Sequence, residues 1–132
     1  MITIPISDVH LTTILESVRL SNLHWSILHI WATSKENSEL DIFALENKTK
    51  TEFGFQLSWE NLLSLSKQID QINECTIVGV SSHGLLPERG LPLENLKASC
   101  DVVIEAVDST NWEISVKDAN LSRKLGQVLI RL

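Results

Sequence analysis

The chain has few of the residues that mark disulfide-rich and nucleotide-binding proteins. Its 132 residues include two cysteines and five glycines. Two cysteines are too few for a disulfide framework or a zinc site, so we expect Cys75 and Cys100 to be buried free thiols in a reducing cytoplasm, with a Cys75–Cys100 bridge as the alternative. None of the glycines stands in a phosphate-binding loop or a dinucleotide fingerprint, so the sequence gives nucleotide binding no support.

Long apolar runs and an excess of basic residues are missing as well. The longest apolar run, Trp25 to Ala32, is far shorter than the roughly 18 to 20 residues of a membrane span. Residues 1–8 have neither the basic region nor the cleavage site of a secretory signal, so we expect a cytoplasmic protein that does not enter a membrane. With 17 acidic against 11 basic residues, the formal net charge of -6 argues against a nucleic-acid surface and fits a basic protein partner.

The residues that are present fit a single α+β domain over the whole chain. The apolar fraction of 43% and the charged fraction of 21% are ordinary for a globular protein of one domain. The strand pattern is clearest near the C-terminus, where Val102 and Ile104 begin an alternating run that ends at the polar turn 108–111. After a second alternating run, Asp118 stands where the N-cap of a helix belongs.

The same alternation predicts further strands, and helical spacing predicts three helices. Short connections favour antiparallel pairing, in one sheet or in two. The predicted strands are 24–33, 39–46, 52–57, 75–81, 101–108 and 111–117. The predicted helices are 6–20, 58–73 behind an N-cap at Ser58, and the segment after Asp118, with a short helical turn at 93–97 in the long segment 81–99.

Two parts of the chain share a strand, cap and helix pattern. Residues 53–62 align with residues 112–121, with matching apolar positions and an identical Asn-Leu pair at the end. The favoured interpretation is that any strand followed by a capped helix obeys the same patterning rules. The alternative is an internal duplication, in which two βββα halves, 24–72 and 75–132, follow an N-terminal helix.

The sequence contains no convincing catalytic or metal-binding constellation. Ser82 and His83 follow an apolar strand, but adjacent side chains generally point apart and no G-x-S-x-G elbow surrounds them, so we interpret this segment as a solvated loop. His24 and His29 have odd spacing, which puts them on opposite faces of a strand and prevents joint chelation. We expect His29 to be a hydrogen-bonded core or interface histidine, and we expect no metal ion, cofactor or enzymatic activity.

Glu105 is a carboxylate in an otherwise apolar strand. A raised pKa and a functional role are one interpretation. The favoured interpretation is a charge on an edge strand that blocks unwanted pairing. The tryptophans are expected to pack in the core, because base stacking works together with a basic groove that the dispersed lysines and arginines do not supply; they are Trp25, Trp31, Trp59 and Trp112.

Two irregular segments are the candidates for contact with a partner. Segment 81–99 is long for a loop in a compact domain, which is typical of functional or mobile loops. The turn 108–111 carries polar residues that folding alone does not require. The predicted partner-binding residues in and beside these segments are Glu88, Arg89, Glu105, Asp108 and Asn111.

The segment from Asp101 to Asp118, with the leucine stripe that follows, resembles C-terminal segments of small cytoplasmic immunity proteins from bacterial polymorphic-toxin and contact-dependent growth inhibition systems. The resemblance implies a small, acidic, non-enzymatic protein that binds and blocks a cognate toxin domain, often a basic nuclease. No functional residue carries over, because these proteins differ in their binding surfaces. Complementary charge would accelerate the association of such a pair.

Two other functions remain open from the sequence. One is a single-stranded nucleic-acid-binding module, which the net charge opposes. The other is a small hydrolase or ligand-binding domain, which requires Ser82 and His83 to face a pocket that also receives Glu105. The sequence leaves the oligomeric state undetermined.

Overall fold

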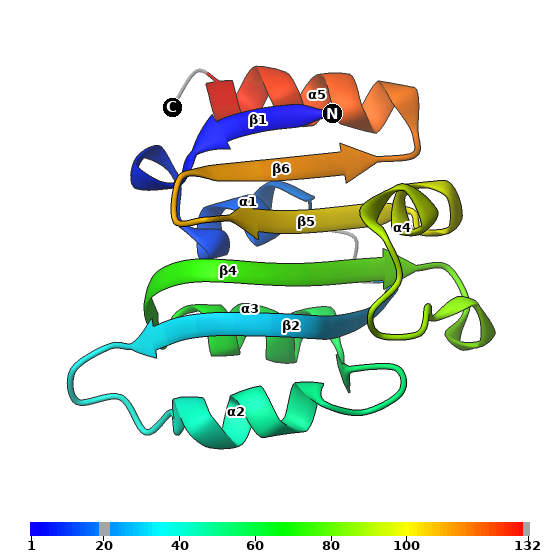
Figure 1. The fold of residues 1–132 in the computed structure, drawn as a ribbon. Coiled ribbons are helices and arrows are strands. Elements are labelled where there is room, and N and C mark those ends of the chain that lie inside the picture. The colour runs from blue at the N-terminus through cyan, green and yellow to red at the C-terminus, as the bar shows by residue number, and fades with distance from the viewer. Residues whose placement is uncertain (19–21, 131–132) are drawn as a thin grey trace.

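In a computed structural model that describes residues 1–18 and 22–130, the chain forms one six-stranded sheet with helices on both faces (Figure 1). The strand order is β1-β6-β5-β4-β2-β3, and every neighbouring pair is antiparallel. The strands are β1 (Ile2–Pro5), β2 (His24–Ser34), β3 (Phe55–Leu57), β4 (Ile69–Val80), β5 (Val102–Val107) and β6 (Asn111–Val116). The described helices are α1 (Leu11–Val18), α2 (Ile42–Thr49), α3 (Trp59–Ser66), α4 (Leu93–Ser99) and α5 (Ala119–Ile130), with short 3-10 turns at Ile6–Asp8 and His83–Leu85. The predicted α+β class with a mainly antiparallel sheet is confirmed, but the described residues form five α-helices where three were predicted.

The sheet separates two apolar clusters of unequal size. The larger cluster joins residues of α1, α3 and α5, such as Leu15, Leu62 and Leu125, to the sheet. The smaller cluster lies on the opposite face, where Leu96 of α4 and Leu86 pack on the central strands. Figure 1 shows α1 and α3 behind the sheet and α4 in front of it. We call the front surface the α4 face.

The central strand β2 changes the direction of its side chains part-way along its length. Trp25 and Ile27 are buried in the larger cluster, and the register with β4 then shifts between Ile27 and His29. An extra residue in one strand of a pair rotates the following side chains. Beyond the shift, Ile30 is buried in the larger cluster, whereas His29 and Trp31 are exposed on the α4 face.

The predicted strand 39–46 is wrong, because this segment contains most of α2. Asp41 Oδ1 accepts hydrogen bonds from the backbone N–H groups of Phe43 and Ala44, both at 3.1 Å, and so caps the helix. Leu45 and Thr49 are buried on one side of α2, whereas Phe43 is 75% exposed. The apolar residues fit both a strand and a helix, and the cap favours the helix.

The predicted helix 58–73 is too long. Ser58 Oγ accepts a hydrogen bond from the Asn61 backbone N–H at 3.1 Å, which confirms the predicted cap. The helix ends at Ser66, and β4 begins at Ile69. Ile69 and Ile72 are both buried because β4 pairs irregularly with β2 at this end. Their spacing of three imitates a helical stripe, so the pattern extended the helix into the strand.

The first strand was missed by the sequence pattern. Ile2 and Ile4 are buried while Thr3 and Pro5 are exposed, and Ile4 pairs with Trp112 of β6. Two buried positions are too few to establish a period, so this segment was not assigned to the sheet. The helix predicted over 6–20 begins only at residue 11, and its last residues 19 and 20 lie outside the described part of the chain.

The prediction of two βββα halves is also wrong. Because 39–46 is helical, the first half reads strand, helix, strand, helix, and the boundary between the halves cuts β4. The units β3–α3 and β6–α5 do share the order strand, cap, helix. That order follows from patterning rules, and a common origin of the two segments stays a prediction.

The C-terminal helix has the predicted cap. Asp118 Oδ1 accepts hydrogen bonds from the backbone N–H groups of Asn120 and Leu121, at 2.9 and 3.1 Å. Leu125 and Leu129 are buried, but Val128, which was predicted on the same stripe, is 52% exposed. The last two residues of the predicted stripe segment, 131 and 132, lie outside the described residues. No helix in the described chain has the length and apolar character to cross a membrane.

Candidate functional site

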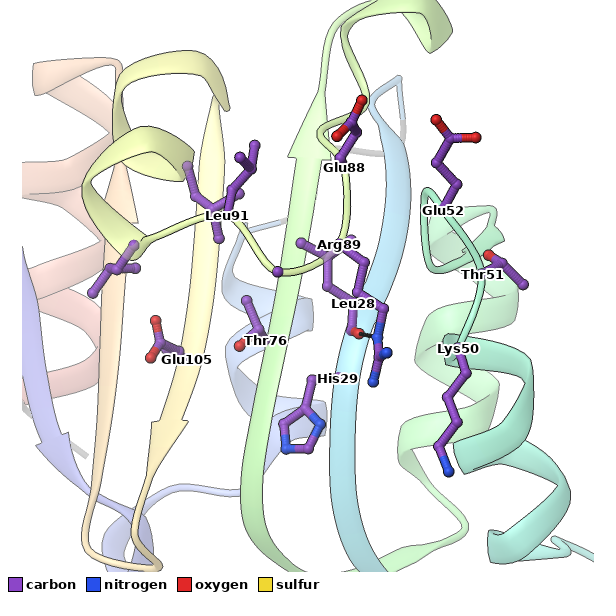
Figure 2. Close-up of a pocket in the computed structure, with 13 residues that line it drawn as sticks. Leu28, His29, Lys50, Thr51, Glu52, Thr76, Glu88, Arg89, Leu91 and Glu105 are labelled. Atoms are coloured by element: carbon purple, nitrogen blue, oxygen red, sulfur yellow. Dashed lines mark hydrogen bonds between the residues drawn. The ribbon is translucent and has the colours of Figure 1, made fainter.

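A cavity of about 700 Å³ opens on the α4 face, between the central strands, α4 and the loop that follows α2 (Figure 2). We call it the α4 groove. Its apolar wall consists of Leu28, Leu91, Leu93 and Leu96. Its ionisable side chains are His29, Lys50, Glu52, Glu88, Arg89 and Glu105. Side chains of both charges therefore surround an apolar wall, which is an arrangement suited to polar recognition.

Arg89 is held in the groove at both its backbone and its side chain. Its backbone N–H donates to the Glu52 carbonyl oxygen at 2.7 Å, which joins the segment before α4 to the loop after α2. Its Nε donates to the Leu28 carbonyl oxygen at 2.9 Å. Leu28 lies at the register shift of β2, where it has no partner residue on β4. The irregularity in the strand thus provides an acceptor that orients the guanidinium group.

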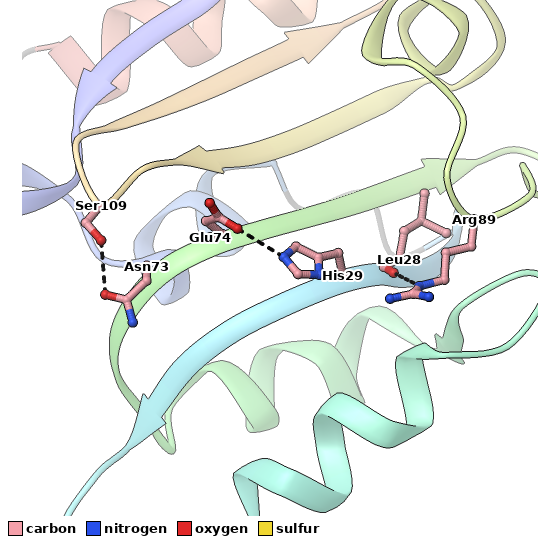
Figure 3. A network of polar contacts seen from close by, with 6 residues as sticks. All are labelled: Leu28, His29, Asn73, Glu74, Arg89 and Ser109. Atoms are coloured by element: carbon pink, nitrogen blue, oxygen red, sulfur yellow. Dashed lines mark hydrogen bonds and ion pairs between the residues drawn. The ribbon is translucent and has the colours of Figure 1, made fainter.

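His29 is exposed, so the core alternative of its prediction is wrong, and its place in an interface stays a prediction. Its side chain is 46% exposed, and Nε2 lies 3.3 Å from Glu74 Oε2 on the neighbouring strand (Figure 3). Trp31 follows on the same face and is 56% exposed. The register shift of β2 explains both positions, because without it these side chains would face the same side as Trp25.

Glu105 lies on an interior strand, and its interpretation as an edge-strand charge is wrong. It is directly opposite Glu113 of β6 and Thr76 of β4, so β5 is paired on both sides. Burial raises the pKa of the Glu105 carboxyl above its ordinary value, the Glu113 carboxylate raises it further, and Lys97 partly offsets both effects. At the α4 groove, Glu105 therefore presents a carboxyl group whose ionisation is energetically costly.

The structure brings three of the predicted partner-binding residues together. Glu88, Arg89 and Glu105 all line the α4 groove. Asp108 and Asn111 instead lie at the turn between β5 and β6, where Asp108 has a φ of 49°. This turn is tied to β4, because the Ser109 backbone N–H donates to the Asn73 carbonyl oxygen at 2.8 Å. Ser109 therefore has a structural role, and the part of Asp108 and Asn111 in partner binding stays a prediction.

Ser82 and His83 do not share a described cavity with Glu105. His83 lines a cavity with His24 and Gln56, and its Nε2 lies 2.6 Å from Gln56 Oε1. The rings of His24 and His83 lie edge to face with centroids 6.0 Å apart. These cavities therefore give no support to a hydrolase site made of Ser82, His83 and Glu105.

The cysteines are buried free thiols, as predicted. Cys75 packs in the larger apolar cluster and Cys100 in the smaller one, so the sheet lies between them and a bridge is excluded. Burial raises the pKa of Cys75 to about 12 and also raises the pKa of Cys100. Both thiols are therefore protonated at neutral pH and play a packing role.

The tryptophans divide into buried and exposed members. Trp25 and Trp112 are 1% exposed, which confirms core packing for this pair. Trp59 is half-buried, and its indole N–H donates to the Leu15 carbonyl oxygen at 3.1 Å. Only Trp31 among the four is exposed, so its predicted place in the core is wrong. Because the other three are buried or half-buried, the four tryptophans form no common stacking surface.

Sequence reasoning missed several residues of the site. Trp31 was assigned to the core, Lys50 to a turn and Glu52 to the predicted strand 52–57. Lys50 and Glu52 line the α4 groove, and Trp31 lines a smaller cavity that shares His29, Lys50 and Arg89 with the groove. The capping residue Asp41 was the sequence signal that could have located Lys50 and Glu52. A helix that starts at this cap places both residues just beyond its C-terminal end. The sequence carried no equivalent signal for the register shift that exposes Trp31.

Comparison of the chain with protein-family models, curated proteins and solved structures finds no match. In the described part of the chain, no group of three or more His, Cys, Asp or Glu side chains has the arrangement of a metal site. The function is therefore inferred from the geometry of the α4 face.

Proposed function

We propose that the protein is a non-enzymatic binding protein that uses the uncovered part of the α4 face to bind and block a basic protein domain. This is the role of the bacterial immunity proteins that the C-terminal segment resembles. The observation that supports it is the gathering of carboxylates on this face, beside an exposed tryptophan. The carboxylates belong to Glu52, Glu74, Glu88, Glu105 and Glu113.

The charge of this face suits a basic partner. The whole chain has a formal net charge of -6, and a negative surface accelerates the encounter with a positive one. A lysine or arginine of the partner placed near Glu105 and Glu113 would relieve the repulsion that raises the Glu105 pKa. Binding would then favour the ionised form of Glu105.

The apolar and aromatic residues of the face suit the centre of a protein interface. Trp31 is 56% exposed and Leu91 is 39% exposed, and both lie beside Arg89. Tryptophan and arginine are the residues most enriched at positions that dominate protein–protein affinity. The acidic side chains would form the rim, and these residues would form the contact centre.

The proposal is tested with the toxin-type domain encoded in the neighbouring reading frame, because immunity proteins are encoded beside their toxins. We expect an equimolar amount of the purified chain to abolish the activity of that domain. We also expect the double variant Glu52→Gln/Glu88→Gln to slow association at low salt, while Glu16→Gln on α1, at the opposite face, leaves the rate unchanged. A neighbouring frame without such a domain, or a domain that stays fully active, would contradict the proposal.

A further inference from the structure

The α4 groove contains a cluster of nitrogen-bearing side chains from three separate segments. His29 lies on β2, Lys50 at the C-terminal end of α2, and Arg89 in the segment before α4. All three line both the α4 groove and an adjoining cavity of about 260 Å³. Figure 2 shows their nitrogen atoms toward one end of the groove and the carboxylates of Glu52 and Glu88 toward the other. An acidic protein thus has a local basic region.

Lys50 and Arg89 form no ion pair with a carboxylate of the described residues. Among residues 1–18 and 22–130, the ion pair between His29 and Glu74 is the only one. Figure 3 shows Glu74 on the side of the His29 ring that faces away from Arg89. Glu46 also lines the adjoining cavity, but it forms no ion pair with a described lysine or arginine. The positive charge at this end of the groove is therefore available to a ligand.

Arg89 is oriented for such a ligand. Its Nε is occupied by the Leu28 carbonyl oxygen at 2.9 Å, and its terminal amino groups form no hydrogen bond with the described residues. A guanidinium group fixed through one nitrogen loses little further freedom when its other donors bind. These donors match the oxygen atoms of phosphate and carboxylate groups.

We propose that Arg89, Lys50 and His29 form a binding site for an oxyanion, a phosphate or a carboxylate group. Arg89 supplies directed hydrogen bonds, Lys50 supplies a second positive charge, and the His29 ring supplies a further donor. Trp31, on the same strand face as His29 and 56% exposed, offers a flat apolar surface to the rest of the ligand. The site is a property of the isolated chain and does not depend on the proposed protein partner.

The test is a titration of the isotope-labelled chain, followed by the backbone amide signals in NMR spectra. Sodium phosphate is added at neutral pH and constant ionic strength, with sodium acetate as the carboxylate probe and sodium chloride as the reference. We expect saturable shifts confined to residues 28–31, 50–52 and 89–91. The tighter of the two probes assigns the site to a phosphate or to a carboxylate group.

Charge-removing variants separate specific binding from general ion effects. We expect Arg89→Gln to weaken the affinity at least about tenfold, because charge-assisted hydrogen bonds are the strong contacts of such a site. Lys50→Gln keeps the bond between Arg89 and Leu28 and should also weaken binding, whereas Arg123→Gln on α5 should not. Shifts that sodium chloride reproduces, shifts spread over the surface, or an affinity that neither groove variant changes would overturn the proposal.

Discussion

At the scale of single residues, Glu105 fits its surroundings poorly. It faces Glu113 across a strand pair and is partly withdrawn from water, and both conditions penalise its negative charge. The folded state therefore holds the Glu105 proton more tightly than the unfolded chain does. Ionisation of Glu105 opposes folding, so its cost is absent below the ordinary glutamate pKa and complete above the raised pKa.

We therefore expect Glu105→Gln to raise the melting temperature at neutral pH, because the neutral amide does not carry this cost. The difference from the wild type should disappear as the pH falls below the ordinary glutamate pKa. Thermal unfolding followed by circular dichroism across this pH range measures both effects. Glu36→Gln, in the exposed loop after β2, is the matched control. A variant that melts at or below the wild-type temperature at neutral pH would refute this account of Glu105.

Gly54, in contrast to Glu105, is a residue whose identity the structure requires. Its φ is +72°, and a Cβ atom there would lie 2.5 Å from the Ile27 carbonyl oxygen and 2.6 Å from Ser26 Oγ. We expect Gly54→Ala to lower the free energy of unfolding by about 2 kcal/mol or more, from backbone strain and steric overlap. Urea denaturation checks this value. Gly84→Ala, where a Cβ atom would meet no atom within 4 Å, should be close to neutral.

At the scale of helices and strands, local chemistry could be predicted from the sequence and non-local pairing could not. The caps at Ser58 and Asp118 and the hairpin of β5 and β6 are as predicted, because each depends on residues close together in the chain. The errors at α2 and at the start of β4 occur where an apolar spacing fits two kinds of element. At α2 the cap at Asp41 favours the helix. At the start of β4 the pairing with β2 favours the strand.

The cap of α5 gives a test at this scale. Asp118 Oδ1 accepts two backbone hydrogen bonds at the start of the helix. We expect Asp118→Ala to lower the free energy of unfolding by about 1 kcal/mol, because the helix loses this partner for its free N–H groups. Asp118→Asn, which keeps a capping oxygen, should retain most of the stability. Equal losses for the two variants in urea denaturation would show that the cap does not stabilise α5.

The candidate site was predictable only in part, because the side-chain directions of some of its residues depend on how distant strands pair. Glu88, Arg89 and Glu105 were singled out because they lie in an irregular segment or interrupt an apolar strand. Trp31 was placed in the core, and His29 in the core or in an interface, because strict alternation puts both beside Trp25. The register shift between β2 and β4 turns both side chains to the opposite face of the sheet. The shift depends on a strand more than forty positions away in the chain, as the pairing of Ile27 with Ile77 shows.

At the scale of the whole molecule, the two faces of the sheet differ in how they are covered. The helices α1, α3 and α5 cover one face and complete the larger core, whereas α4 covers part of the other face (Figure 1). Charged residues and the exposed Trp31 lie on the part that α4 leaves uncovered. Under the proposed function, recognition uses this uncovered part and the larger core lies on the opposite face. Substitutions on the uncovered part of the α4 face should change binding far more than folding.

The most direct test of this account is the affinity of the chain for the toxin-type domain encoded beside it, measured by titration calorimetry for the wild type and for Trp31→Ala. We expect Trp31→Ala to weaken binding by about 2 kcal/mol or more, as substitutions at the centre of an interface do, with little change in melting temperature. Phe43→Ala, which removes a 75% exposed aromatic side chain from α2, should bind as the wild type does. Equal affinities of the wild type and Trp31→Ala, or no binding by the wild type, would contradict the assignment of the α4 face to partner recognition.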